Sequence, residues 1–293
     1  MPNVRGNGID IEYEEFGDRR GRPLLLIMGL GAQMILWRED FCEQLAARGH
    51  RVIRFDNRDV GKSSMLDHFG VPDVVAAMTA ALTGQPVAAP YLLHDMAADA
   101  AALLQTLRID AAHIVGASMG GMIAQALAID HPARVRTLTS IMSTTGDRTL
   151  PPARPEALGV LLMPPPANRQ QSIERAVSVF RTIGSPGFPF DEAEVRDLAG
   201  RSYDRGFNPA GLARQLVAII ASGSRKDTLQ SVRVPTLVIH GKDDPLVPVE
   251  AGYATSAAVP GAQLLIIEGM GHDLPRPVWP RVIDAISALT AAN

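Results

Sequence analysis

Gly116-Ala117-Ser118-Met119-Gly120 is the stretch of this sequence that decides the fold. It follows the short β-branched run His113–Val115 and leads into Met119–Ile129, which is rich in helix-forming residues. A serine between two glycines at a strand-to-helix boundary is typical of a sharp turn that exposes its hydroxyl to substrate. A β-carbon at either glycine position would clash in so tight a bend. A glycine-rich loop ahead of a helix would give the same pattern, so the rest of the chain has to distinguish the two interpretations.

The composition of the 293-residue chain restricts the classes of protein to which it can belong. A hydrophobic fraction of 46% suits one large domain, or a domain with an insertion. The net charge of −3 gives no electrostatic footprint for nucleic acid or anionic membrane. Residues 1–8 lack an apolar signal core, and no apolar run approaches the roughly 18 residues of a membrane span.

The single cysteine, Cys42, excludes an intrachain disulfide framework and suits a reducing compartment. Because Cys42 falls in a predicted helix, we interpret it as a small core residue rather than a reactive thiol. We therefore expect a cytoplasmic protein that binds neither nucleic acid nor membrane.

Short apolar runs alternate with helical patterns over most of the sequence. Ile9–Phe16 alternates apolar and acidic residues, as a half-exposed edge strand does. The other predicted strands are continuous apolar runs: Leu24–Met28, Val52–Phe55, His113–Val115, Val135–Met142, Thr236–Ile239 and Leu264–Ile267. Predicted helices are Trp37–Arg48, Leu93–Leu107, Met119–Ile129 and Pro277–Ala291. This alternation predicts an α/β fold with a mostly parallel, doubly wound sheet.

One long segment interrupts the alternation. Residues 146–226 show no strand pattern; they begin with several prolines and continue with helical patterns, clearest at Ser172–Thr182 and Pro209–Ile220. We predict a helical cap inserted before the last two strands, over a core domain formed by residues 1–145 and 227–293. The aromatic residues of this segment are Phe180, Phe188, Phe190, Tyr203 and Phe207. We expect one or two of them to face a pocket and the others to pack the cap itself.

A serine hydroxyl becomes a good nucleophile when a histidine takes its proton and a carboxylate orients that histidine. In this architecture the acid and then the histidine follow the serine, each just after a strand. His272 lies among glycines directly after Leu264–Ile267. This order predicts Ser118 as the nucleophile and His272 as its general base.

The acid is expected in the loop after Thr236–Ile239, which contains Asp243 and Asp244. Their side chains should point in different directions, so one serves and the other is solvated. Asp147, which follows an earlier strand, is an alternative acid.

An acyl-transfer site also needs two backbone N–H groups directed at the developing oxyanion. Met119, directly after the nucleophile, is predicted to supply one. Leu30, in the Gly29-Leu30-Gly31 loop after a strand, is predicted to supply the other.

Two rival motifs fail on inspection. The Gly29-Leu30-Gly31 loop is not a dinucleotide fingerprint, because the third glycine would fall at Met34. Gly61-Lys62-Ser63 is not the end of a P-loop, because the first glycine would fall at Asp56. Metal-binding motifs such as HExxH, paired CxxC or a calcium loop are not found in the sequence, so we predict neither a cofactor nor a metal.

With these residues in place, the chain resembles the α/β-hydrolase superfamily over nearly its whole length. Asp56–Ser63 is similar to that superfamily's DxRGxGxS segment, with Asp59 in place of a glycine. Met28-Gly29 stands where His-Gly is usual. Both departures, together with Gly269–His272, resemble the aclacinomycin methylesterase group of esterases. In that group the acid is the aspartate before a proline, so the resemblance implies Asp244-Pro245 and hydrolysis of a carboxylic ester.

The sequence therefore predicts a serine carboxylesterase that acts through an acyl-enzyme on a small-molecule ester. The sequence is compatible with a homo-oligomer but does not determine the oligomeric state. The alternatives are a cofactor-free perhydrolase or haloperoxidase, a C–C bond hydrolase or lactonase of the same fold, and a non-catalytic ligand-binding protein. The serine at position 118 argues against dehalogenase and epoxide hydrolase chemistry, which uses an aspartate nucleophile in this fold.

Overall fold

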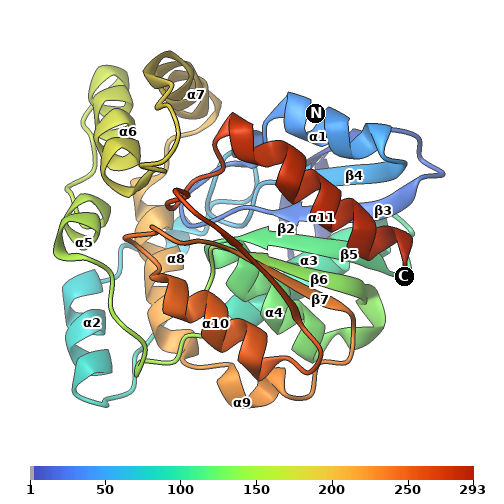
Figure 1. The fold of residues 1–293 in the computed structure, drawn as a ribbon. Coiled ribbons are helices and arrows are strands. Elements are labelled where there is room, and N and C mark those ends of the chain that lie inside the picture. Colours follow the sequence, from blue (N-terminus) through green and yellow to red (C-terminus); the bar gives the residue numbers. More distant parts are fainter. Residues whose placement is uncertain (1–2) are drawn as a thin grey trace.

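A computed structural model describes residues 3–293; residues 1 and 2, the start of the predicted core domain, lie outside the described residues. A central sheet lies between helical layers, and a further group of helices stands at one side (Figure 1). Within the described part of the chain, the sheet has eight strands in the order β1-β2-β4-β3-β5-β6-β7-β8. β1 (Asn3–Gly6), β2 (Ile9–Phe16) and β4 (His50–Phe55) pair antiparallel. The other neighbours are parallel and include β3 (Arg22–Ile27), β5 (Ala112–Ala117), β6 (Val135–Ile141), β7 (Thr236–Gly241) and β8 (Gln263–Ile267).

The predicted α/β fold with its mostly parallel sheet is confirmed. One detail of the prediction is wrong, because Ile9–Phe16 is not the edge of the sheet. β1 pairs along it, with Gly6 opposite Ile9 and Asn3 opposite Glu12. The four residues of β1 carry no apolar alternation, so the sequence pattern did not reveal them.

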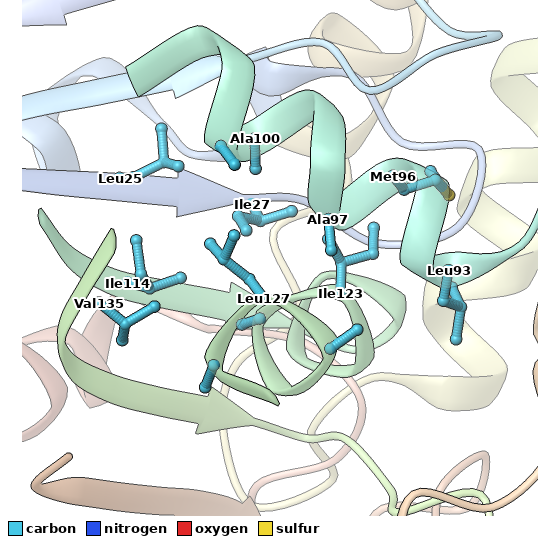
Figure 2. Packing of buried hydrophobic residues seen from close by; sticks show 14 of the residues in the cluster. Leu25, Ile27, Leu93, Met96, Ala97, Ala100, Ile114, Ile123, Leu127 and Val135 are labelled. Carbon is cyan, nitrogen blue, oxygen red and sulfur yellow. The ribbon is translucent and has the colours of Figure 1, made fainter. Parts of the chain in front are cut away.

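Helices cover both faces of the sheet. On one face, α3 (Leu93–Thr106) and α4 (Met119–Asp130) pack against the strands through aliphatic side chains. Figure 2 shows Leu93, Met96 and Ala97 from α3 beside Ile123 and Leu127 from α4, over Leu25, Ile27 and Ile114. On the other face lie α1 (Glu39–Ala47) and α11 (Trp279–Ala291). Cys42 of α1 is fully buried there, and burial raises the pKa of its thiol to about 12, as expected of a core residue.

Two further helices and four short 3₁₀ turns of the described residues lie outside the segment between β6 and β7. They are α2 (Val74–Leu82), α10 (Val249–Ala258) and the short 3₁₀ turns η1 (Met34–Leu36), η2 (Asp67–Phe69), η3 (Pro132–Arg134) and η4 (Arg276–Val278). Among residues 3–293, no helix combines the length and the apolar character needed to cross a membrane.

Between β6 and β7 the described chain forms helices and no strand. These are α5 (Pro155–Leu161), α6 (Arg169–Ile183), α7 (Glu192–Arg205), α8 (Pro209–Ser222) and α9 (Lys226–Leu229). The N-cap side chains of Asn168, Asp191 and Asn208 each accept a backbone N–H from the following turn, which fixes where α6, α7 and α8 begin. We refer to residues 146–226 as the helical insertion; α5, α6 and α7 stand together beside the sheet (Figure 1).

A buried ion pair attaches α8 to the core. Arg214 Nη2 lies 2.7 Å from Asp59 Oδ1 and Arg214 Nε lies 2.9 Å from Asp59 Oδ2, with both side chains fully buried. The Tyr91 hydroxyl donates to the same carboxylate at 2.7 Å. Burial by itself raises the pKa of Asp59, but these hydrogen bonds, with one from the Leu66 N–H, bring it below its ordinary value. The carboxylate is therefore ionised and fully paired.

Replacing Arg214 by methionine should lower the free energy of unfolding by about 3–5 kcal/mol, because Asp59 is left as a buried, uncompensated charge. Urea unfolding measures this loss. The matched control is Arg169→Met, since Arg169 and its partner Asp204 are about half exposed. That exposed pair should contribute less than about 1 kcal/mol. Equal losses in the two variants would show that the Arg214 pair does not hold α8 as described.

The buried histidine of β5 should make stability depend on pH. His113 Nδ1 lies 3.0 Å from Thr137 Oγ1, and burial lowers the pKa of His113 to about 4. The unfolded chain binds this proton near pH 6.5, so stability that is present above pH 6.5 is lost as pH falls toward 4. The loss amounts to about 3 kcal/mol. Urea unfolding of wild type and His113→Leu at several pH values should show the smaller pH dependence in the variant; parallel curves would refute the prediction.

Candidate active site

Ser118 joins β5 to α4 in a strained backbone conformation. Its φ is +55°, a region that residues with side chains rarely adopt. The flanking glycines are required by packing. A β-carbon on Gly116 would lie 2.0 Å from the Gly120 carbonyl oxygen, and one on Gly120 would lie 2.1 Å from the Ile27 carbonyl oxygen. This is the sharp strand-to-helix turn that the sequence predicted.

Three side chains from separate loops meet at the carboxyl edge of the sheet. Ser118 Oγ lies 2.9 Å from His272 Nε2, and His272 Nδ1 lies 2.7 Å from Asp244 Oδ2. The other carboxylate oxygen of Asp244 accepts the backbone N–H groups of Leu246 and Val247, at 2.9 and 2.8 Å. With Asp244 ionised, Nδ1 of His272 carries the proton, so Nε2 accepts from the serine hydroxyl. The structure thus brings Ser118, His272 and Asp244 together.

The two other candidate acids have different partners. Asp243 Oδ2 accepts the Gly269 N–H at 2.8 Å, which braces the loop that carries His272. Asp147 pairs with Lys226 at 2.8 Å, and this hydrogen bond lowers the pKa of Asp147 to about 2. Among the described residues, neither carboxylate is a hydrogen-bond partner of His272.

The predicted oxyanion donors lie beside the nucleophile. A β-carbon on Gly29 would be 3.1 Å from Ser118 Cβ, so glycine allows the loop after β3 to approach the serine. Ala32 N–H donates to Gly29 O at 3.2 Å and closes this loop into a turn. Among residues 3–293, neither the Leu30 N–H nor the Met119 N–H donates to a protein acceptor. Both groups therefore lack a hydrogen-bond partner within the described residues.

Comparison with known proteins identifies the family of this chain. Residues 22–275 match the family described as alpha/beta hydrolase fold. The chain belongs to the α/β-hydrolase fold family. This α/β hydrolase is 31% identical to the rhodomycin D methylesterase of Streptomyces peucetius, with 99% of this chain and 97% of the relative covered. It is 32% identical to the enzyme of the same name from Streptomyces sp. strain C5, over 95% of this chain and 94% of the relative.

Solved structures agree on the fold of this α/β hydrolase. A meta-cleavage product hydrolase from Pseudomonas fluorescens IP01 superposes with a TM-score of 0.75, covering 100% of this chain and 98% of the other. At 21% identity, this likeness concerns the fold alone. The predicted family membership is confirmed by the family match and by the two methylesterase relatives.

The loop carrying His272 in this α/β hydrolase is bonded to the helical insertion. His272 N–H donates to Ile183 O at 2.7 Å, and Gly271 N–H donates to Ser185 Oγ at 2.9 Å. The Ser185 hydroxyl in turn donates to Asp273, and burial raises the pKa of that carboxyl. Neither Ser185 nor Asp273 is predicted from the sequence. The one local signal was that Asp273 follows the predicted base.

A second histidine lies close to Asp244. His240 Nε2 is 3.8 Å from Asp244 Oδ2, but its hydrogen bond goes to Val247 O at 2.7 Å. Burial lowers the pKa of His240, so this imidazole is neutral and leaves the carboxylate to His272. Within residues 3–293, no group of three or more His, Cys, Asp or Glu side chains is arranged to hold a metal ion.

The helical insertion also borders a groove of about 560 Å³. Phe180, Phe188 and Phe190 line it, so three of the aromatic residues face a groove where one or two were expected. Tyr203 and Phe207 instead stack on each other, with ring centroids 5.0 Å apart. Ser118 and His272 are not among the residues that line this groove.

The Ser185 and Asp273 contact should be measurable as a coupling energy. Ser185→Ala leaves the Gly271 N–H without a partner and removes the hydroxyl hydrogen bond to the buried Asp273 carboxyl, which should lower the free energy of unfolding by about 1–3 kcal/mol. In a double-mutant cycle with Asp273→Ala, urea unfolding should give a coupling above about 0.5 kcal/mol. Ser231→Ala, at an exposed helix end, serves as control and should change stability by less than about 0.5 kcal/mol. Strict additivity of the two changes would contradict the contact.

Proposed function

We propose that this protein is a serine carboxylesterase with Ser118, His272 and Asp244 as its catalytic triad. The observation that carries the proposal is the continuous hydrogen-bonded chain from Ser118 Oγ through His272 to Asp244. The free N–H groups of Leu30 and Met119 beside the serine support it. Two relatives over nearly the whole chain, at 31% and 32% identity, are named methylesterases, which supports a carboxylic ester as the substrate.

The acylation step follows from this geometry. Ser118 Oγ attacks the ester carbonyl carbon while His272 Nε2 takes the hydroxyl proton. The carbonyl oxygen becomes an oxyanion and is held by the N–H groups of Leu30 and Met119. Asp244 stays ionised and stabilises the imidazolium of His272. The tetrahedral intermediate then collapses, and His272 gives its proton to the departing alcohol.

Deacylation repeats these steps with water. His272 takes a proton from the water molecule, whose oxygen attacks the acyl carbon on Ser118. The same N–H groups hold the second oxyanion, and His272 returns the proton to Ser118 Oγ as the acid leaves. All groups in the proposed cycle belong to the protein, the ester and water, so it needs neither a metal nor an organic cofactor.

We propose further that the helical insertion, residues 146–226, is a cap over a core domain of residues 1–145 and 227–293. Its contacts with loops at the carboxyl edge of the sheet support this role. Arg205 Nη2 lies 3.0 Å from Asp56 Oδ2, and Gln33 Nε2 donates to Ser202 O at 2.7 Å. A cap in this position would exclude water from the acyl-enzyme and shape the pocket for the ester.

A cytoplasmic location is also proposed. Cys42 is the one cysteine of the sequence and is buried as a free thiol. A chain that uses no disulfide suits a reducing compartment.

Ser118→Ala should lower kcat for p-nitrophenyl butyrate by at least about a thousandfold, because no other group replaces the nucleophile. Asp244→Asn should also lower kcat strongly, since it stabilises the wrong tautomer of His272. Fluorophosphonate labelling should disappear in Ser118→Ala, while the thermal midpoint stays close to that of the wild type. Full activity in Ser118→Ala would rule out the mechanism.

Assays with other substrates distinguish the esterase from the rival activities. A panel of esters graded by acyl length and alcohol bulk should identify the preferred ester. Addition of hydrogen peroxide tests for peracid formation, and lactones and vinylogous 1,5-diketones test for lactonase and C–C bond hydrolase activity. The esterase assignment requires that simple esters give the highest kcat/KM of these classes. A protein that fails to react with fluorophosphonate would be a ligand-binding member of the family instead.

A further inference from the structure

Gln215 of α8 connects two loops of the core through its side-chain amide. Its side chain is fully buried. Gly31 N–H donates to Gln215 Oε1 at 2.8 Å, and Gln215 Nε2 donates to Arg58 O at 2.7 Å. Because one partner is a donor and the other an acceptor, only one orientation of the amide satisfies both. The side chain is therefore held in a single position.

The Gly31 N–H belongs to the turn that carries a proposed oxyanion donor. This turn, Gly29–Ala32, is closed by the hydrogen bond from Ala32 N–H to Gly29 O. A trans peptide directs its C=O and N–H to opposite sides. Since the Gly29 carbonyl points into the turn, the Leu30 N–H of the same peptide points out of it, away from Ala32.

The next peptide, between Leu30 and Gly31, depends on Gln215. Gly31 has a φ of +63°, as the third residue of a type II turn does. Glycine adopts positive and negative φ about equally readily, so this peptide can rotate to the opposite orientation at little energetic cost. The acceptor Oε1 of Gln215 holds the Gly31 N–H in one of these orientations.

The helix beneath Gln215 is itself fixed. Arg214, the preceding residue, makes the buried ion pair with Asp59. One turn earlier, the side chain of Leu212 fills the space beside Gly31, where a β-carbon would lie 2.3 Å from Leu212 Cδ1. The Gln215 amide is thus presented to the turn from a rigid support, which is what a positioning group requires.

We propose that Gln215 is a positioning residue for the oxyanion hole. It does not touch the reacting atoms. By holding the Gly31 N–H, it fixes the turn so that the Leu30 N–H lies beside Ser118 and is free to bind the oxyanion. This inference rests on the proposed esterase function.

Gln215→Met, a substitution of similar volume, removes both hydrogen bonds. We expect kcat for p-nitrophenyl butyrate to fall by about ten- to a hundredfold, because a displaced donor stabilises the transition state less well. KM should stay within about twofold, since the donor acts mainly on the oxyanion. Gln170→Met, at an exposed position of α6, is the matched control and should behave as wild type.

An alkyl trifluoromethyl ketone provides the decisive readout. Ser118 Oγ adds to its carbonyl carbon, the serine proton moves to His272, and the carbonyl oxygen becomes a bound oxyanion. In Gln215→Met its affinity should fall by the same factor as kcat/KM, whereas the affinity for the matching alkyl methyl ketone, which lacks the activating fluorine atoms and stays trigonal, should change much less. Equal losses of affinity for the two ketones would show a merely structural role and overturn the proposal.

The wild-type protein gives a test that does not depend on how the variant folds. In amide exchange measured by NMR, the Gly31 N–H should be protected in the free enzyme. When the ketone binds, the Leu30 and Met119 amide resonances should shift downfield, while Gly31 keeps its resonance and its protection. A freely exchanging Gly31, or a Gly31 resonance that responds as an oxyanion donor, would overturn the proposal.

The outcomes distinguish this inference from the function on which it rests. Full hydrolysis by Ser118→Ala removes the esterase proposal and the inference with it. If Ser118 is essential but Gln215→Met matches the wild type in kcat and ketone affinity, only the role of Gln215 is refuted.

Discussion

The strained backbone of Ser118 is the constraint on which the site depends. Its positive φ is held because Gly116 packs on the Gly120 carbonyl and Gly120 packs on the Ile27 carbonyl. These contacts bring the first turn of α4 against the end of β3. The Met119 N–H and the loop containing Leu30 therefore flank the same serine. Two close contacts of backbone on backbone thus position both the nucleophile and the groups beside it.

Much of the fold could be predicted because its strands are continuous apolar runs, which give a strong local signal. β1 was missed because Asn3–Gly6 is short and polar, and α2 was missed because Val74–Leu82 has no helical periodicity that separates a buried face. For the site, chain order indicated Ser118 and His272, whereas the sequence pattern did not decide whether Asp243 or Asp244 is the acid. The sequence around Gln215 gave no signal of its role, because its hydrogen-bond donor Gly31 lies 184 positions away in the chain.

One departure from the common sequence pattern of the family, Asp59, has a structural explanation. Asp59 stands where a glycine is usual, and it has a φ of +69°, which glycine adopts more easily. The strain is offset by a carboxylate that accepts hydrogen bonds from Arg214, Tyr91 and the Leu66 N–H. Asp59 thus has a strained backbone but makes the ion pair that fixes α8. The helix α8 in turn places Gln215 beside the turn that contains Leu30.

The hydrogen bonds between Ile183–Gly187 and Gly269–Asp273 limit which segments can be exchanged between this chain and a related α/β hydrolase. These two segments are distant in sequence but are joined by backbone hydrogen bonds. They are also closely packed, since a β-carbon on Gly187 would lie 2.5 Å from Gly269 Cα. A chimera that imports the helices of a relative without the matching histidine loop would therefore lose both hydrogen bonds and close packing. The insertion is consequently not a freely exchangeable module: its evolution is tied to that of the loop, and crossover points that separate the two segments would be selected against.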